Sequence, residues 1–286
     1  MAHSHGGAGS PGGRFAEGIL VSAMWSYATS VLEPTRALRR AGLAPERGRS
    51  GELPARVTTR GAGPHFCRRY RAPVLLNRAT EHDHLVEEFD RMGEVYDAFV
   101  RPFSTPIFSE ALEVMREWMP HDARVLDAGC GCGRELQRVA HLVPNGEVVG
   151  IDLAAGMVNA AHRDAAAHGL TNVAFVQSDV GDLPPEFAGR FDVVYNCLAH
   201  HHYPEPQRAS RAILRVLRPG GVYCIVDPGP AWFNAISSGL AKWGDPGWIR
   251  FHTPDEFGVL LGDAGFLRVG SVELLPGFNL TVAQAS

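Results

Sequence analysis

The sequence predicts an α/β protein whose core is a doubly wound sheet. Strand-like and helix-like segments alternate from Arg124 onward, as such a sheet requires. A glycine-rich loop, GCGCG, joins the first of these strands to the first helix. The chain has 286 residues, which is enough for one large core or for a core with a smaller cap.

The elements of this core follow from apolar runs and their boundaries. Strands are expected at 124–128, 147–152, 173–179, 191–196 and 222–227. Helices are expected at about 133–142, 155–168, 206–217, 230–242 and 254–264. Thr253 and Pro254, a cap followed by a first-turn proline, open the last helix. Pro276 and Gly277 divide the C-terminal tail into two strands that we expect to pair as a hairpin.

Composition and periodicity divide the chain into an extension (1–80), a helical segment (81–120), which the resemblance described below makes a lid, and the core (121–286). The extension holds 12 arginines against four glutamates, whereas residues 81–286 hold 15 basic and 27 acidic residues. The extension is also rich in glycine and proline, so we expect it to be largely flexible apart from a helix within 16–40. A solvated extension, a basic arm that docks an anionic partner and a targeting leader all fit this composition.

Two helices are expected in the lid. Apolar residues recur at three- and four-residue spacing between Leu85 and Phe99, which marks one face of an amphipathic helix. Pro102 and Pro106 are then expected to interrupt the chain before a second helix, IFSEALEVMREWM.

The glycine loop differs from a dinucleotide-binding loop. Its glycines are Gly129, Gly131 and Gly133, and Arg134 stands where the GxGxxG pattern has its last glycine. Asp127 lies at the end of the strand, two residues before the first glycine. A carboxylate disfavours a bound pyrophosphate and favours an ammonium or sulfonium ligand.

Two more acids end the following strands. Asp152 is placed to accept hydrogen bonds from both hydroxyls of a ribose. Asp179 is placed to accept a hydrogen bond from an exocyclic amine such as that of adenine. Because ligands of such sheets bind outside the carboxyl ends of the strands, Asp127, Asp152 and Asp179 together predict a positively charged nucleoside.

Five motifs in order resemble the class I S-adenosylmethionine-dependent methyltransferases, in particular the type 11 small-molecule group. They are VLDAGCGCG, VVGIDLAAGMV, QSDVGDLP, FDVVYNCLAHHHYPEP with ILRVLRPGG, and FHTPDEFGVLLGDAGF. The resemblance covers about residues 85–285. It implies S-adenosyl-L-methionine as cofactor and a Rossmann-like sheet of seven strands with the last antiparallel. It also implies these cofactor-binding residues: Tyr96 in the lid, Asp127, Gly129, Gly131, Gly133, Asp152, Met157, Asp179, Val180 and Asn196.

Three histidines follow the fourth strand, where the family places residues that face the transferred methyl group. His200 and His201 are the candidates for a base that takes a proton from the acceptor, and a purely structural role is the alternative. We predict no metal site, because Cys130 and Cys132 lack further cysteine or histidine ligands at metal spacing and the histidine run lacks a visible partner.

The implied reaction is methyl transfer to a small-molecule acceptor, a natural product or quinone-like ring, at O, N or C. The tetrad [DN]PP[YF] of amine methylation of bases is absent after Asn196, and the acidic core argues against nucleic acid. An RNA or peptide methyltransferase that docks through the basic arm, and a protein that binds the cofactor without transferring methyl, remain alternatives.

Cellular context follows from cysteine usage and hydropathy. Five cysteines at no scaffold-like spacing indicate a reducing compartment, and we expect a cytoplasmic protein. No window reaches the roughly 18 apolar residues that a membrane span needs. The oligomeric state stays open.

Overall fold

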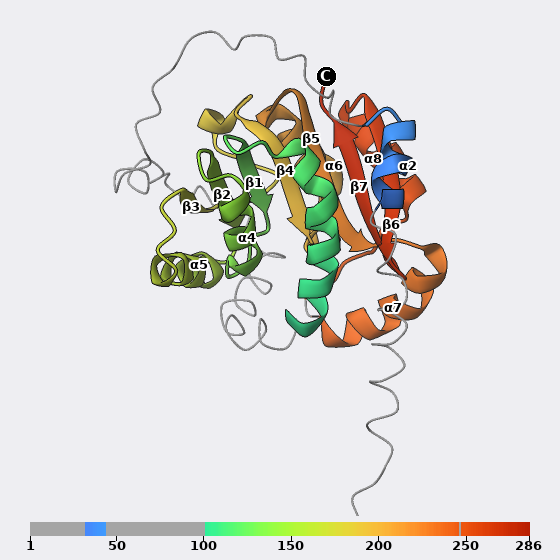
Figure 1. Cartoon of the computed structure of the whole chain (residues 1–286). Coiled ribbons are helices and arrows are strands. Elements are labelled where there is room, and N and C mark those ends of the chain that lie inside the picture. The colour runs from blue at the N-terminus through green and yellow to red at the C-terminus, as the bar shows by residue number, and fades with distance from the viewer. Residues whose placement is uncertain (1–31, 44–100, 246) are drawn as a thin grey trace, which may run out of the picture.

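The computed structural model of the chain describes residues 32–43, 101–245 and 247–286, and these form a seven-stranded mixed sheet covered by helices (Figure 1). The strand order is β3-β2-β1-β4-β5-β7-β6. Only β7 runs antiparallel to its neighbours β5 and β6. The strands are β1 (Arg124–Ala128), β2 (Glu147–Asp152), β3 (Val173–Gln177), β4 (Phe191–Cys197), β5 (Leu217–Pro228), β6 (Arg268–Leu275) and β7 (Phe278–Gln284). The expected doubly wound, Rossmann-like fold with an antiparallel last strand is confirmed.

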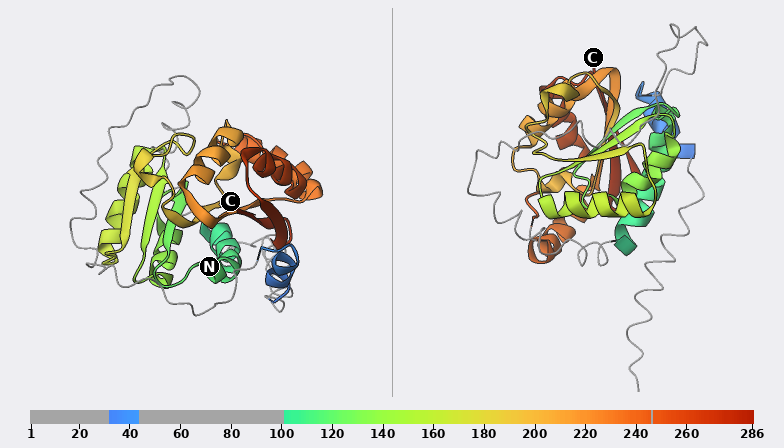
Figure 2. Two further views of the ribbon diagram at one scale, coloured as in Figure 1. Left: turned by 90° about the horizontal axis from the view of Figure 1, so that it is seen from above. Right: turned by 90° about the vertical axis from the view of Figure 1, so that its left-hand side faces the viewer.

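Helices cover both faces of the sheet, so the fold has three layers (Figure 2). Neighbouring residues of β1 belong to different cores: Val125 packs on one face and Leu126 on the other. The first face carries α2 (Leu32–Arg40), a helix over residues 101–115, α4 (Arg134–Leu142) and α5 (Ala155–Ala167). The second face carries α6 (Pro206–Val216) and α8 (Pro254–Ala264). The remaining elements are α7 (Ala231–Gly244) beyond the end of β5 and the short turns η1 (Arg116–Trp118), η2 (Pro185–Phe187) and η3 (His200–His202).

The boundaries of three strands differ from those expected, and the smallest difference is in β4, which extends by one residue to Cys197. β3 ends at Gln177, because the Asp179 side chain accepts a hydrogen bond from the Gly181 N–H (2.7 Å) and turns the chain. β5 begins at Leu217 instead of 222, since Leu217 already pairs with Phe191 before a register shift in the ladder. All these differences lie at strand ends, where local pairing decides the boundary.

The prolines of the lid region do not interrupt its second helix. The helix already includes residue 101 and runs through Pro102 and Pro106 to residue 115. Its apolar side, which includes Phe108 and Met115, is fully buried in the first core. Burial of such side chains, worth about 1.5–3 kcal/mol each, offsets the roughly 3 kcal/mol cost of an interior proline. The expected first lid helix, with Tyr96, lies outside the described residues.

The C-terminal part of the helix expected within 16–40 is α2, which packs on β6. Leu38 and Leu43 are buried against this strand, and Arg268 of β6 donates a hydrogen bond to the Gly42 carbonyl (3.0 Å). A Cβ atom at Gly270 would lie 2.8 Å from a methyl carbon of Leu43, so glycine permits this close approach. The rest of the extension lies outside the described residues.

Helix α8 begins where its capping residue and first-turn proline predict. The Thr253 hydroxyl accepts a hydrogen bond from the Glu256 N–H (3.3 Å), and the Glu256 carboxylate accepts one from the Thr253 N–H (2.8 Å). In the part of the chain that the structure describes, no helix is both long enough and apolar enough to cross a membrane.

Candidate active site

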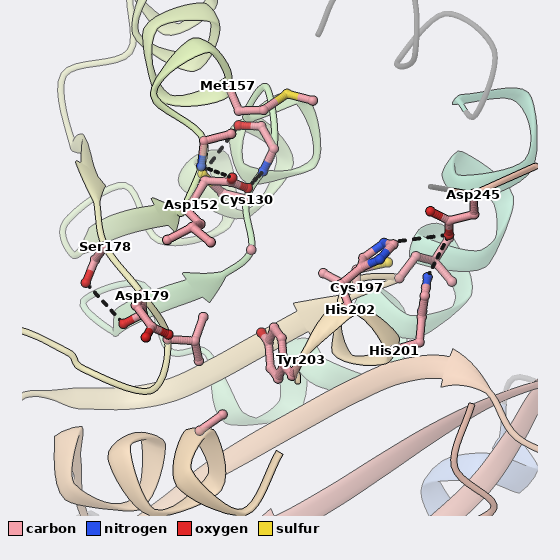
Figure 3. A pocket seen from close by; sticks show the side chains of 18 of the residues that line it. Cys130, Asp152, Met157, Ser178, Asp179, Cys197, His201, His202, Tyr203 and Asp245 are labelled. Carbon is pink, nitrogen blue, oxygen red and sulfur yellow. Dashed lines mark hydrogen bonds and ion pairs between the residues drawn. The ribbon is translucent and has the colours of Figure 1, made fainter. Parts of the chain in front are cut away.

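One cavity of about 390 Å³ opens at the carboxyl ends of the parallel strands. Its lining comes from the loops that follow β1, β2, β3 and β4, with contributions from α6, the end of β5 and the segment after α7. Figure 3 shows two groups of side chains in it: Asp152, Met157 and Asp179 lie together, and His201, His202 and Asp245 lie apart from them. We call these groups the carboxylate end and the histidine end. Tyr203 lies between them (Figure 3).

The glycine loop forms part of the cavity wall. Gly129 and Gly131 both adopt positive φ (96° and 52°) and line the cavity. A Cβ atom at Gly131 would meet nothing within 4 Å, so this glycine leaves open space for a ligand. Gly133 (φ 79°) does not line the cavity, and its missing Cβ would lie 2.8 Å from that of Ala161. The missing side chain at Gly133 therefore allows close packing against Ala161 of α5, whereas the missing side chain at Gly131 leaves space in the cavity.

Backbone N–H groups hold the carboxylate of Asp152 at the wall. Gly131 donates to its Oδ2 atom and Ala154 donates to its Oδ1 atom, both at 2.9 Å. The side chain thus connects the glycine loop with the start of α5, whose Met157 also lines the cavity. An ionised carboxylate at a cavity wall is a hydrogen-bond acceptor for the hydroxyl groups of a ligand.

Asp179 and Val180 line the cavity beside Asp152, as their place after β3 predicts. The Asp179 carboxylate accepts hydrogen bonds from the Gly181 N–H and from the Arg208 guanidinium (3.0 Å). Both Asp179 and Arg208 are about one-third exposed, and such pairs contribute at most about 1 kcal/mol. Arg208 therefore orients Asp179 more than it stabilises the fold.

Two expected cofactor-binding residues lie beneath the cavity lining. Asp127 is 3% exposed and accepts a hydrogen bond from the Tyr195 hydroxyl (2.7 Å). Burial raises the pKa of Asp127 to about 8, the charges of Asp152 and Glu135 add to that rise, and the Tyr195 hydrogen bond opposes it. Asn196 is buried and donates to the Ala128 carbonyl at 2.7 Å. It therefore supports the loop from below.

The structure corrects the expectation of a base at His200. Its imidazole is 1% exposed, does not line the cavity and packs against Tyr203, His252 and Phe257. Burial, with neighbouring His252 and His201, lowers the pKa of His200 well below its usual value. His200 is thus a neutral core residue that the cavity does not reach.

His201 does line the cavity, where two carboxylates hold it. Its Nδ1 atom lies 2.6 Å from Oδ1 of Asp227, and its Nε2 atom lies 3.3 Å from Oδ2 of Asp245. Burial alone lowers the pKa of His201, but Asp227 and Asp245 outweigh it and raise the pKa to about 9. An imidazole that already carries its proton at pH 7 cannot accept another one, so the structure does not support His201 as the base in this state.

Two residues of the histidine end were not among the expected site residues. His202 lies with its Nε2 atom 3.7 Å from the same Oδ2 of Asp245. Asp245 caps the C-terminus of α7 and lines the cavity. The only signal for Asp245 in the sequence is the Asp-Pro pair after an apolar helix, which predicts a helix end and not a ligand.

Comparisons with known proteins identify the domain. Residues 121–246 match the family model of a methyltransferase domain. The nocamycin O-methyltransferase of Saccharothrix syringae is 37% identical over 144 residues, which cover 50% of this chain and 50% of that protein. The chloroplastic 2-methyl-6-phytyl-1,4-hydroquinone methyltransferase 1 of Oryza sativa subsp. japonica is 27% identical over 231 residues, which cover 80% of this chain and 66% of that protein. The match thus spans about half the length of the first relative.

A solved structure supports the same fold. A SAM-dependent methyltransferase from Aquifex aeolicus superposes with a TM-score of 0.54 at 23% identity, covering 70% of this chain and 98% of that chain. In this chain the cavity lies where the strand-end acids predict it, and residues 121–246 form a domain that matches the methyltransferase family model and is similar to S-adenosylmethionine-dependent methyltransferases.

Proposed function

We propose that this protein transfers the methyl group of S-adenosylmethionine to a small organic molecule, a natural product or a quinone-like ring, at O, N or C. One observation carries the proposal: a single cavity joins the carboxylate end, suited to a nucleoside, to the histidine end, suited to a polar acceptor group. A methyl donor and its acceptor need this adjacency, because the reacting atoms must meet in line.

The carboxylate end fits the nucleoside. Asp152 is placed to accept hydrogen bonds from the ribose hydroxyls, and Asp179 from the adenine amine. Met157 and Val180 offer apolar contact to the ring. Asp127, directly below the glycine loop, is protonated at pH 7 when its pKa is about 8. The sulfonium or ammonium charge of the cofactor would favour the ionised form of Asp127, so binding of a cationic ligand is expected to release the Asp127 proton.

We place the methyl acceptor at the histidine end of the cavity. His201, His202 and Asp245 supply polar atoms there, and Phe251 and Pro228 supply apolar surface. The acceptor atom attacks the methyl carbon, the C–S bond breaks, and its electron pair stays on sulfur as the neutral thioether. The sulfonium is already activated, so holding both partners in line can supply most of the acceleration. The names of the nocamycin and hydroquinone methyltransferases support a small organic acceptor.

A reducing compartment suits the described cysteines. Cys130, Cys132, Cys197 and Cys224 form no disulfide with one another, and burial raises the pKa of the Cys130, Cys197 and Cys224 thiols. Such thiols are poorly reactive. We propose a cytoplasmic location on this ground.

Calorimetry followed by product analysis tests the proposal. S-adenosylmethionine and its demethylated product are titrated into the purified protein, and micromolar affinity, about −8 kcal/mol, is expected for both. The protein is then incubated with cofactor and a panel of phenols, hydroquinones, amines and carboxylic acids, and mass spectrometry detects one added methyl group. Absence of cofactor binding by folded protein would overturn the proposal. Binding without consumption of the cofactor on any acceptor would favour a non-methylating cofactor-binding protein.

A further inference from the structure

Three metal-ligand side chains meet at the histidine end. One nitrogen each from His201 and His202 and one oxygen from Asp245 lie within 4.8 Å of one another. His201 and His202 come from η3 after β4, and Asp245 comes from the end of α7, so the fold brings together residues more than forty positions apart. Figure 3 shows the two rings and the carboxylate turned toward one another at the cavity.

The spacing of these atoms suits a tetrahedral ion. Zinc bonds to histidine nitrogen and carboxylate oxygen are about 2.0–2.2 Å long, so the edges of a zinc tetrahedron measure roughly 3.3–3.6 Å. Nε2 of His201 lies 3.3 Å and Nε2 of His202 lies 3.7 Å from Oδ2 of Asp245. The first distance matches such an edge, the second is about 0.1 Å longer than its upper end, and the two nitrogens lie within 4.8 Å of each other.

A buried carboxylate orients the first histidine. Asp227 at the end of β5 is 1% exposed and lies 2.6 Å from Nδ1 of His201. With the Nδ1 proton donated to Asp227, Nε2 is left to bind an ion or a proton on the side of Asp245. Metal-binding histidines commonly donate their other N–H to a carboxylate in this way, which fixes the tautomer and the ring orientation.

We propose that His201, His202 and Asp245 bind one divalent metal ion, zinc foremost, and that the position left open toward the cavity takes a hydroxyl oxygen of the methyl acceptor. Three protein ligands with a fourth position for water or substrate are typical of catalytic zinc sites. The metal site stands on its own geometry, whereas the acceptor part rests on the proposed methyl transfer. The acceptor part restricts the methyl acceptor to molecules with an oxygen atom that can bind the metal ion.

The reaction balances without a further reagent. The acceptor hydroxyl binds the ion, which lowers its pKa, and its proton leaves to water. The resulting oxygen anion attacks the methyl carbon, the new O–C bond forms and the C–S bond breaks with its electron pair on sulfur. The products are the methyl ether, the neutral thioether and one proton. His201 and His202 act here as ligands, and neither needs to accept the acceptor proton.

Cobalt(II) is the probe for the site. The full chain is dialysed against chelator, titrated with Co²⁺ and followed by visible absorption, in which a tetrahedral ion gives intense d–d bands; zinc is then added to displace it. We expect one bound Co²⁺ per chain in the wild type. Binding should be lost in Asp245→Asn and His202→Ala, and Asp227→Asn should weaken it by about 10- to 100-fold.

A matched control is available on α5 and its C-cap. His168 and Asp164 form another histidine–carboxylate pair (3.7 Å), half-exposed on the His168 side and outside the cavity lining. His168→Gln should therefore bind Co²⁺ like the wild type. Far-UV circular dichroism and a cooperative thermal melt report that each variant is folded, independently of cofactor binding, and His202→Gln replaces His202→Ala if that variant fails this check.

The outcomes separate the two proposals. Absence of Co²⁺ binding by wild-type protein that binds S-adenosylmethionine overturns the metal site and leaves methyl transfer standing. Co²⁺ binding that survives Asp245→Asn and His202→Ala also overturns it. Absence of S-adenosylmethionine binding overturns methyl transfer, while Co²⁺ binding lost in these variants still supports the metal site. Chelation that lowers turnover on hydroxyl acceptors, with cofactor affinity unchanged, supports the acceptor part; turnover unaffected by chelation overturns it.

Discussion

The two ends of the cavity are built in opposite ways. At the carboxylate end, Asp152 ends β2 and Asp179 follows β3. Backbone N–H groups hold both carboxylates: Ala154 and the glycine loop hold Asp152, and Gly181 holds Asp179. At the histidine end, His201 and Asp245 come from distant parts of the chain and hold one another through side chains. The first end is thus fixed by local sequence, whereas the second depends on how α7 packs. Variants that affect one end and spare the other test this difference.

The largest effect is expected from Asp152→Ala. The change removes the proposed acceptor of the ribose hydrogen bonds and releases the Gly131 and Ala154 N–H groups. Hydrogen bonds to charged groups are worth about 1.5–3 kcal/mol each, so affinity for S-adenosylmethionine should fall by at least about 100-fold in calorimetry. Asp182→Ala, an exposed acid outside the cavity lining, is the control and should leave affinity unchanged. Equal affinity in Asp152→Ala and wild type would contradict the nucleoside assignment.

Asp127→Asn should remove a pH dependence of stability. The raised pKa means that the folded protein keeps a proton on Asp127 that the unfolded chain releases above its ordinary pKa near 3.8. Asp127 therefore makes its full contribution to the free energy of unfolding below about pH 4. This contribution is lost as the pH rises toward 8, at up to about 1.4 kcal/mol per pH unit. Denaturant melts without cofactor at pH 5 to 8 should show this slope in the wild type and not in the variant. The same slope in both proteins would show that Asp127 is ionised without the cofactor.

Two glycine variants separate strain from ligand exclusion. Gly131 and Gly189 both adopt positive φ (52° and 61°), and a Cβ atom at either would meet nothing within 4 Å. Each change to alanine should cost about 1–2 kcal/mol of stability. Only Gly131 lines the cavity, so only Gly131→Ala should weaken cofactor binding, by about tenfold. Similar losses of affinity in both variants would mean that strain, and not the added methyl group, is responsible.

The smallest effect is expected from Phe251→Leu at the histidine end. Phe251 lines the cavity with its ring centroid 5.0 Å from that of His201. The smaller side chain should raise the KM of the acceptor by about fivefold, because a methylene-sized change in an apolar pocket is worth about 1–3 kcal/mol and the low end of that range is about fivefold. Cofactor affinity should change by less than about twofold. Trp232→Leu, exposed on α7 and outside the lining, is the control; a rise in cofactor Kd in Phe251→Leu would show that the two ends are not separate.

The fold was predictable because its signals are local. The bounds of β1, β2 and α8 agree with apolar runs and with the Thr253–Glu256 cap. The prolines misled the prediction for the helix over 101–115, since the burial of Phe108 and its neighbours is a tertiary effect. The carboxylate end was predictable for the same reason as the strands: an acid directly after a buried strand lies at the sheet edge where ligands bind.

The histidine end could not be predicted in detail. A run of three histidines does not show which ring enters the cavity, and the turn η3 directs His200 into the core while His201 and His202 line the cavity. Asp245 joins them only because α7 ends there, and nothing in the spacing of the sequence announces it. Asp127 and Asn196 show a further limit, because strand-end position alone does not tell a lining residue from one beneath the lining.

The docking of α2 on β6 has a consequence for biosynthesis. Gly42 and Arg268, joined by a hydrogen bond, are separated by 226 positions. At roughly 5–20 residues per second, the ribosome needs on the order of 10–45 s to add that much chain. During this interval the leucines of α2 lack the strand that buries them. Although α2 is the first described helix to be made, it cannot reach its native contacts until β6, on which it packs, has been synthesised.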